Sequence, residues 1–247
     1  MNFERADTYT LNLLKEADAY NRWIFQKMKP WIGKRILEVG CGIGNITGLL
    51  LSYGKVFVSD INIEYLQIVE KKFKDNPNFQ GSIMWNITEN PSRDLYNAID
   101  TIVCCNVLEH IEDDESALKK FYQLLPFDGK LIIIIPALKI LYNPLDHELG
   151  HFRRYNKSEV IKKLKSCSFK ILYIDFFNIS GIIGWFINGN ILKRRFLSRK
   201  QIKIFNKFVP ILLRLEKIVP SFIGLSIIAV GEKRRNIFEA QCDNTCL

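Results

Sequence analysis

The sequence lacks the features of an exported, disulfide-stabilised or membrane-spanning protein. Its first residues are charged and no apolar segment follows them, so we expect no signal peptide. No stretch reaches the roughly 18 uninterrupted apolar residues of a spanning helix, and the nearest approach, residues 176–192, is interrupted by three asparagines. No two cysteines form a C-x-x-C pair, which argues against a zinc ribbon or a disulfide framework. We therefore expect a cytoplasmic protein with reduced thiols at Cys41, Cys104, Cys105, Cys167, Cys242 and Cys246.

Acidic residues are scarce in one segment. Residues 182–220 contain nine basic side chains and one acid, Glu216, so nearly all of the formal net charge of +9 lies there. The rest of the chain is close to neutral and no recognised aromatic module accompanies the basic residues, so we expect no nucleic-acid partner. Apolar residues interleave with the basic ones, as in amphipathic helices that bind anionic bilayers. Two interpretations stay open: peripheral contact with the inner membrane face through residues 182–220, or a solvated outer face on helices that cover a substrate cleft.

Strand-like apolar segments alternate with helical patterns along the chain. Residues 63, 66, 69 and 73 are apolar at spacings of three or four, which predicts a helix. Residues 131–135 form a continuous apolar run, as expected of a central strand buried on both faces. Alternating strands and helices predict a parallel sheet with right-handed crossovers. Strands are predicted at residues 35–39, 55–60, 79–85, 99–105, 131–135, 169–177 and 225–230, and helices at about 8–28, 45–53, 63–73 and 117–124.

We predict a single domain over residues 1–247, of the α/β class. Its centre is a Rossmann-like, doubly wound sheet of seven strands, mostly parallel with an antiparallel last strand. Ser158 is expected to N-cap a helix with Glu159 in its first turn. Three segments are added to the sheet: an N-terminal helical region at residues 8–30, a lid insertion at 137–156 and a basic, amphipathic helical insertion at 178–222.

A glycine-rich turn follows the first predicted strand. Gly40, Gly42 and Gly44 allow the backbone to approach a ligand closely and to adopt angles that other residues avoid. The turn leads into a predicted helix, whose N-terminal N–H groups favour an anionic group such as a carboxylate. Asp60 ends the second strand twenty residues after Gly40, where a carboxylate can accept hydrogen bonds from both hydroxyls of a ribose. The sequence therefore predicts a nucleoside-bearing ligand across the strand ends.

The spacing of the glycines separates two classes of cofactor. The dinucleotide pattern G-x-G-x-x-G needs a glycine at position 45, which is Asn45 here. The sequence has G-x-G-x-G instead, preceded by the acid Glu38. Residues 36–45, ILEVGCGIGN, resemble motif I of the class I S-adenosylmethionine-dependent methyltransferases, and residues 106–111, NVLEHI, resemble that family's signature after the fourth strand.

The resemblance covers about residues 20–233, is nearest to bacterial methyltransferases of types 11 and 12, and implies S-adenosylmethionine as the cofactor. Asp60 matches the family's ribose-binding acid, and Asn86 stands where the family usually has an aspartate near the adenine. Glu38 would hold the amino group of the methionine part, directly or through water, or would cap neighbouring backbone N–H groups. The implied cofactor-binding residues are Glu38, Gly40, Cys41, Gly42, Gly44, Asp60, Ile61, Asn86, Ile87, Asn106 and Val107.

Residues 146–155, DHELGHFRRY, are the segment richest in reactive side chains, and relatives of this family usually carry substrate-recognition insertions there. His147 or His151 is a candidate general base, and His110 is a second candidate. The alternative interpretation is that this segment only orders the lid through capping and ion pairs. Candidates for binding an anionic acceptor are Arg153, Arg154 and Tyr155.

Residues 147–151 also match the zinc-protease pattern H-E-x-x-H. That pattern needs a helix that carries both imidazoles on one face, whereas here Gly150 lies inside it and Pro144 precedes it. The only other histidine is His110. We therefore expect neither a zinc protease nor a resident metal.

The predicted reaction is methyl transfer by in-line displacement, most simply to an oxygen of a small-molecule, saccharide or glycolipid acceptor. Correct placement of the two reactants can account for ~7–11 kcal/mol of such a barrier. A general base is needed only when the acceptor must lose a proton. Two alternatives stay open: an NAD-dependent oxidoreductase, which Asn45 and residues 106–111 disfavour, and a non-catalytic scaffold that binds adenosylmethionine.

Overall fold

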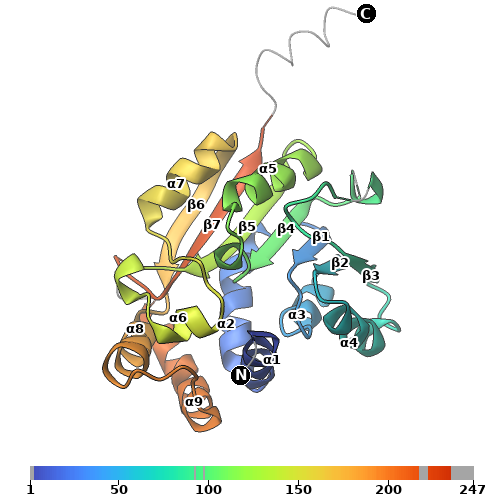
Figure 1. Ribbon diagram of the computed structural model, residues 1–247. Helices are drawn as coiled ribbons and strands as arrows, with labels where there is room; N and C mark the ends of the chain where they lie inside the picture. The colour runs from blue at the N-terminus through green and yellow to red at the C-terminus, as the bar shows by residue number, and fades with distance from the viewer. Residues whose placement is uncertain (1–2, 92, 97, 217–221, 235–247) are drawn as a thin grey trace, which may run out of the picture.

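The structure of the protein, a computed structural model, describes residues 3–91, 93–96, 98–216 and 222–234. Cys242, Cys246 and Lys217 lie outside these residues. A seven-stranded sheet forms the centre of the molecule, in the order β3-β2-β1-β4-β5-β7-β6 (Figure 1). The strands are β1 (Arg35–Val39), β2 (Lys55–Asp60), β3 (Phe79–Met84), β4 (Thr101–Cys105), β5 (Lys130–Pro136), β6 (Phe169–Phe177) and β7 (Ser226–Lys233).

The sheet has the predicted mixture of strand directions. Strands β1 to β5 pair in parallel, whereas β7 runs antiparallel to both of its neighbours, β5 and β6. The carboxyl ends of β1, β2 and β4 therefore meet at one edge, which is where ligands bind in sheets of this kind. The prediction of an α/β, doubly wound sheet with an antiparallel last strand is confirmed.

Helices cover both faces of the sheet. Apolar side chains of α5 and α7 pack on one face, and those of α2, α3, α4 and α9 pack on the other. The α-helices are α1 (Phe3–Lys15), α2 (Asp18–Met28), α3 (Thr47–Leu51), α4 (Ile63–Phe73), α5 (Asp114–Leu124), α6 (Pro144–Glu148), α7 (Lys157–Ser166), α8 (Ile179–Trp185) and α9 (Arg199–Glu216). Shorter turns of helix are η1 (Lys29–Trp31), η2 (Arg93–Leu95), η3 (Leu108–His110), η4 (Lys139–Leu141) and the π-helix η5 (Phe186–Ile191).

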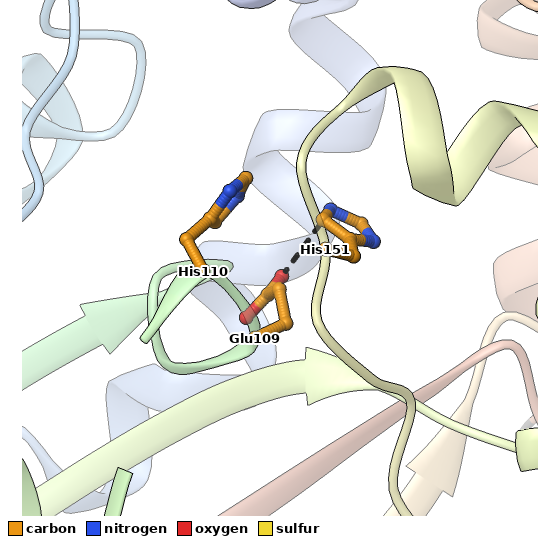
Figure 2. Close-up of side chains that lie close together, drawn as sticks. All are labelled: Glu109, His110 and His151. Carbon is orange, nitrogen blue, oxygen red and sulfur yellow. Dashed lines mark ion pairs between the residues drawn. The ribbon is translucent and has the colours of Figure 1, made fainter. Parts of the chain in front are cut away.

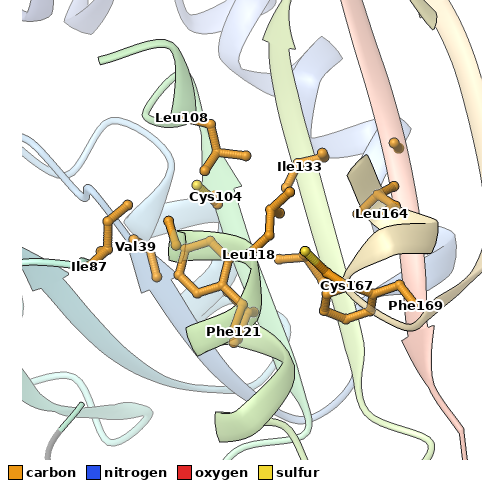
Figure 3. Close-up of a cluster of buried hydrophobic side chains, with 14 of the residues drawn as sticks. Val39, Ile87, Cys104, Leu108, Leu118, Phe121, Ile133, Leu164, Cys167 and Phe169 are labelled. Atoms are coloured by element: carbon orange, nitrogen blue, oxygen red, sulfur yellow. The ribbon is translucent and has the colours of Figure 1, made fainter. Parts of the chain in front are cut away.

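Alternate residues of each central strand enter the two cores. On β5, Ile133 packs with α5, while Ile132 and Ile134 pack toward α2 and α9. Figure 3 shows the first of these cores, in which Phe121 of α5 lies beside Val39 and Cys104. A strand whose side chains are apolar on both faces cannot lie at a solvated surface, so the run at residues 131–135 fixes β5 inside the sheet.

Three details differ from the predicted elements. The opening helix is two helices, because the chain turns between α1 and α2 at Glu16–Ala17. Helix α7 begins two residues earlier than predicted, so Asn156 rather than Ser158 occupies the N-cap position. The lid insertion at residues 137–156, where no helix is predicted, contains η4 and the short helix α6.

The ends of the lid are held together beside the sheet. Ala137 and Tyr155 form a parallel β-bridge, in which Tyr155 N–H donates to the Pro136 carbonyl at 2.9 Å and Leu138 N–H donates to the Tyr155 carbonyl at 2.9 Å. The chain thus leaves the end of β5 and returns to the same place before α7 begins. No helix among the described residues is long and apolar enough to cross a membrane. The described cysteines, Cys41, Cys104, Cys105 and Cys167, are free thiols, as predicted for these four.

Candidate active site

A cavity of about 1080 Å³ lies at the carboxyl ends of β1, β2 and β4. The glycine turn after β1 and the loops after β2, β3 and β4 form one side of it, and the lid forms another. Helices α1, α2 and α9 and the segment from α8 to residue 197 complete the wall. Every predicted cofactor-binding residue except Gly44 lines this cavity, and so do all three candidate bases.

The glycine turn has the backbone conformation that the sequence predicts. Gly40, Gly42 and Gly44 have φ values of +69°, +50° and +79°, which favour glycine. A Cβ on Gly40 would lie 2.3 Å from Cγ2 of Val107, so the close approach of this turn to the loop after β4 also requires glycine. Gly44 lies away from the cavity and packs against α4, where a Cβ would lie 2.9 Å from the ring of Phe73.

Two buried acids face the cavity beside this turn. Oδ2 of Asp60 accepts a hydrogen bond from Gly42 N–H and Oδ1 accepts one from Asn62 N–H, both at 2.9 Å. Burial raises the pKa of Asp60, and these backbone donors oppose the shift. Oε2 of Glu38 accepts a hydrogen bond of 2.6 Å from the hydroxyl of Thr47, and burial raises the pKa of Glu38 to about 8. Glu38 lines the cavity, and the positive charge of the nearby Lys72 opposes the rise in its pKa.

The remaining predicted cofactor residues follow β2, β3 and β4. Ile61 is exposed beside Asp60, and Ile87 is buried. The side chain of Asn86 accepts hydrogen bonds from Thr88, so its amide orders its own turn. Asn106 has a left-handed backbone with φ of +53°, and its N–H donates to the Ile134 carbonyl at 2.8 Å. This bend turns the chain after β4 into the cavity.

The loop after β4 and the lid bring three side chains together, as Figure 2 shows. Glu109 and His110 belong to η3, and His151 follows α6. The lid is fixed to η3 by a hydrogen bond of 2.8 Å from Phe152 N–H to the Glu109 carbonyl. Nε2 of His151 lies 4.0 Å from Oε1 of Glu109, and the rings of His110 and His151 meet edge to face with centroids 4.8 Å apart.

Glu109 is the least compensated charge in this cluster. It is fully buried, and neither carboxylate oxygen has a hydrogen-bond partner among the described residues. Burial raises its pKa to about 7, although the nearby His151 opposes the shift. Burial also lowers the pKa of His110 to about 3, so this imidazole is neutral near pH 7. A buried carboxylate without hydrogen bonds is costly, so the site is incomplete until a donor enters the cavity.

Asp146 connects the lid to the rest of the cavity wall. Its Oδ1 lies 2.9 Å from Nδ1 of His151 and accepts a hydrogen bond of 2.8 Å from Nε of Arg154. Its Oδ2 accepts one of 3.2 Å from Nε1 of Trp185 on α8. Burial alone would raise the pKa of Asp146, but His151 and Arg154 lower it. Asp146 is therefore ionised near neutral pH and holds the imidazole of His151 with Nε2 directed toward Glu109.

The ligand atoms of Glu109, His110 and His151 lie within 4.8 Å of one another, so these three residues could also hold a metal ion.

The predicted mismatch with the zinc-protease pattern has a structural reason. Helix α6 ends at Glu148, so His147 and His151 do not share a helical face. His147 is exposed at the edge of the cavity.

Comparison with known proteins agrees with this geometry. Residues 37–133 match the family model described as a methyltransferase domain, and they span β1 to β5 with the glycine turn, Asp60 and η3. Residues 37–133 therefore carry the methyltransferase domain of the class I S-adenosylmethionine-dependent methyltransferases.

The protein resembles curated proteins over part of its length. It is 30% identical over 149 residues to an uncharacterized protein of Methanocaldococcus jannaschii, a match that covers 60% of this chain and 59% of that protein. It is 27% identical over 113 residues to the ubiquinone biosynthesis O-methyltransferase of Actinobacillus pleuropneumoniae, a match that covers 44% of this chain and 48% of that protein. The matched stretch thus spans about half of each relative.

Solved structures share the fold of this protein at low identity. The YcgJ protein from Bacillus subtilis has a TM-score of 0.58 and 17% identity, over 85% of this chain and 97% of that one. Phosphoethanolamine N-methyltransferase 2 of Haemonchus contortus, solved in complex with S-adenosyl-L-methionine, has a TM-score of 0.59 and 14% identity, over 87% of this chain and 52% of that one.

The cavity fits the family's cofactor on three grounds. Gly40 and Gly42 line it with backbone alone, so a ligand can approach the turn closely. Oδ2 of Asp60 accepts from Gly42 N–H and Oδ1 accepts from Asn62 N–H, which leaves each oxygen a further lone pair for a ribose hydroxyl. Glu38 offers a buried carboxylate to the amino group of the methionine part.

The structure corrects the placement of the predicted acceptor-binding residues. Arg153 binds the Glu112 carbonyl at 2.7 Å and lies 3.5 Å from Oδ2 of Asp114, and the hydroxyl of Tyr155 donates to the same carboxylate at 2.8 Å. Neither side chain lines the cavity. Arg154 lines it, but its guanidinium is buried against Asp146 and the Ala137 carbonyl. These side chains order the base of the lid, because Asp114 and Asp146 are buried acids that need cationic and hydroxyl donors.

Sequence reasoning missed four parts of the wall. Leu11 of α1 lies over Gly42, and Nδ2 of Asn45 donates to the Leu11 carbonyl at 3.0 Å, so the N-terminal helix closes the cavity above the glycine turn. Phe196 and Phe205 of the basic insertion line it from the other side. Glu109 is predicted only as part of the signature at residues 106–111, and its contact with the lid has no signal in the sequence.

Proposed function

We propose that this methyltransferase transfers a methyl group from S-adenosylmethionine to an oxygen of a small-molecule, saccharide or lipid-linked acceptor. The observation that carries the proposal is the imidazole of His151, which an ionised carboxylate orients inside the same cavity as the glycine turn. Glu38, Asp60 and the turn hold the cofactor, and the lid holds the acceptor.

The bound cofactor supplies a sulfonium-linked methyl group: the acceptor oxygen forms a bond to the methyl carbon, the carbon–sulfur bond breaks with its electron pair going to sulfur, and the acceptor proton must leave. Nε2 of His151 takes that proton, because Nδ1 is already committed to Asp146. This is the arrangement of a general base with an orienting acid, in which the acid fixes the tautomer.

Glu109 acts on the base after the proton has moved. An imidazolium at His151 lies between Asp146, 2.9 Å from Nδ1, and Glu109, 4.0 Å from Nε2. Both carboxylates are buried, so their attraction for the cation is screened less than at a surface. Glu109 would complete its own hydrogen bonding by accepting from a second polar hydrogen of the acceptor, because the proton of the reacting hydroxyl goes to Nε2 of His151.

His110 and His147 are the alternative bases. His110 is held neutral at physiological pH by burial and can therefore accept a proton, but its low pKa makes it a weak base. His147 is exposed at the rim and has no polar partner among the residues described, so nothing orients its ring. We assign the base to His151 on this difference.

Two measurements test the function. Titration calorimetry with S-adenosylmethionine, its demethylated product and NAD should show binding of the first two only; selective NAD binding would indicate an oxidoreductase. Incubation with methyl-labelled S-adenosylmethionine and a cell extract, followed by separation into aqueous and lipid fractions, should yield a labelled product. Cofactor binding with no label in any fraction would indicate a scaffold.

A further inference from the structure

Helix α9 has an inner face that packs on the protein and an outer face that does not. Val209 is fully buried, and Phe205 meets the ring of Tyr20 of α2 edge to face with centroids 5.8 Å apart. Asn206 accepts a hydrogen bond from the Tyr20 N–H at 3.1 Å. The inner face thus fixes the rotation of α9, and the residues on the other side of the helix must face outward.

The outward side of α9 carries an apolar stripe. Ile204, Phe208 and Ile211 are 50%, 51% and 53% exposed. Their spacing of four and then three residues places them above one another along a single line of the helix. Single exposed apolar residues are ordinary, but three large ones in a row on one helix indicate a contact surface.

A basic band runs beside this stripe. At 100° per residue, Lys200, Lys203, Lys207 and Arg214 fall on the sector next to Ile204 and Ile211. Lys203 pairs with Glu16 at 3.3 Å. No acid of the described chain lies within ion-pairing distance of Lys200, Lys207 or Arg214, and all three are exposed. The band therefore presents uncompensated positive charge next to apolar side chains.

The segment before α9 repeats this combination. Ile183, Ile187, Ile191 and Leu192 are exposed along α8 and η5. Three consecutive basic residues, 193–195, follow them directly. Arg195 lies 3.7 Å from the Glu148 carboxylate and Arg194 donates to Oδ1 of Asn188 at 3.0 Å, so the charge of this segment is partly compensated. Figure 1 shows α8 and α9 together at the lower end of the molecule, with α7 toward the upper end. We call this set of exposed apolar and basic residues the cationic apolar surface: Ile183, Ile187, Ile191, Leu192, residues 193–195, Lys200, Lys203, Ile204, Lys207, Phe208, Ile211 and Arg214.

We propose that the cationic apolar surface docks on an anionic lipid bilayer. Apolar side chains of an interfacial helix enter the boundary between headgroups and acyl chains, and the flanking lysines and arginines contact lipid phosphates. The charge argues against a second copy of this chain on the same surface, because a symmetric contact would oppose like charges. The positive charge of this surface also favours an anionic bilayer over a neutral one.

Docking at this surface gives the acceptor a defined source, an inference that rests on the proposed function. The active-site cavity is lined by Trp185 of α8, by Ile202 of α9, and by Phe196 and Leu197 of the segment between η5 and α9. The wall between the bilayer and the cavity is therefore one helix layer thick. The acceptor is carried by a lipid, and its reactive hydroxyl enters between α8 and α9 while its acyl part stays in the membrane.

Vesicle sedimentation tests the docking with the full chain. Vesicles of phosphatidylcholine containing one third phosphatidylglycerol should bind the protein at low salt, vesicles of phosphatidylcholine alone should not, and binding should weaken as salt rises. Lys207→Glu with Arg214→Glu should reduce binding at least about tenfold. Phe208→Ser with Ile211→Ser should reduce it by a similar factor.

The matched control reverses two exposed lysines elsewhere. Lys162→Glu with Lys165→Glu on α7 changes the net charge equally and should leave vesicle binding unchanged. Each variant is first checked for native circular dichroism and for unchanged affinity for the demethylated cofactor. Equal losses of vesicle binding in the α7 and α9 variants would show that net charge alone explains the binding, and would overturn the proposal. Absence of binding to anionic vesicles would also overturn it.

Other occupants give distinct results. Tight binding of a short nucleic-acid duplex that anionic vesicles do not displace would assign the surface to nucleic acid, and a dimer dissociated by the Phe208 and Ile211 changes would assign it to a second copy; either would overturn the proposal. Label in the lipid fraction, lost in the α9 variants, supports the lipid-linked acceptor. Label in the aqueous fraction without vesicle binding would overturn the docking while the methyltransferase function stands.

Discussion

The two sides of the active-site cavity differ in how their polar groups are satisfied. On the cofactor side, Asp60 accepts hydrogen bonds from two backbone N–H groups, and Glu38 accepts one from Thr47. On the lid side, both oxygens of Glu109 lack a partner in the described chain, although the residue is fully buried. The first side is already organised by the protein, and the second lacks a donor. The difference indicates that cofactor binding requires little rearrangement, whereas the acceptor contributes to the order of its own site.

The sharpest test of the lid side is removal of the base. His151→Ala should reduce the rate of label transfer by roughly 10²–10⁴-fold, because the acceptor proton loses its oriented base, while the affinity for cofactor stays the same. The rate is measured as methyl label incorporated into the acceptor fraction of a cell extract. His147→Ala is the comparison variant, and a larger loss from it than from His151→Ala would move the base to His147.

On the cofactor side, Asp60→Ala should weaken binding by about 3 kcal/mol, on the order of 100-fold, because the ribose loses both hydroxyl partners. Calorimetry with the demethylated product measures this without an acceptor. Asp60→Asn keeps one acceptor oxygen and should give an intermediate affinity. Unchanged binding in the alanine variant would show that the ribose is held elsewhere.

The glycine turn should be sensitive even without a ligand. Gly40→Ala is expected to lower the free energy of unfolding by about 2 kcal/mol, because its φ of +69° is left-handed and the new Cβ meets Val107. Gly184→Ala on α8 is the matched control, since its Cβ would have no neighbour within 4 Å. The control should be neutral or stabilising by roughly 0.4–1 kcal/mol. Urea unfolding measures both, and equal effects would refute the steric argument.

The smallest expected effect is a shift in pH dependence. Burial raises the pKa of Glu109 to about 7, so this carboxyl takes up a proton as the pH falls through 7 and stops stabilising the His151 cation. The rate of label transfer should therefore decline on the acidic side with a midpoint near that pH. Glu109→Gln should move the midpoint to lower pH and reduce the plateau about tenfold. A profile identical to that of the unchanged protein would remove Glu109 from the mechanism.

The cofactor side could be predicted from sequence because it is built from local pattern. Glycines at 40 and 42 and the acid at the end of β2 act within one strand–turn–helix unit and its neighbour, so spacing alone places them. The apolar run of β5 likewise fixed its position in the sheet. Only Gly44, which packs on α4, has a different place from the one predicted.

The lid side depends on contacts between residues far apart in the chain. Sequence showed that residues 146–155 are rich in reactive groups, but not that Arg153 and Tyr155 turn to Asp114 on α5. The meeting of Glu109 with His151 follows from one backbone hydrogen bond of the lid, which no spacing rule predicts. Contacts between residues far apart in the sequence thus decide which reactive side chains of residues 146–155 reach the cavity.

The carboxylate of Asp146 connects helix α8 at the molecular surface to the candidate base His151. Asp146 accepts from Trp185 of α8 with one oxygen and contacts His151 with the other, so a displacement of α8 alters the orientation of the imidazole. Arrival at a lipid interface should therefore change the catalytic constant itself, beyond any gain in local substrate concentration. Such interfacial activation would make a short-chain, water-soluble acceptor react faster when empty anionic vesicles are present.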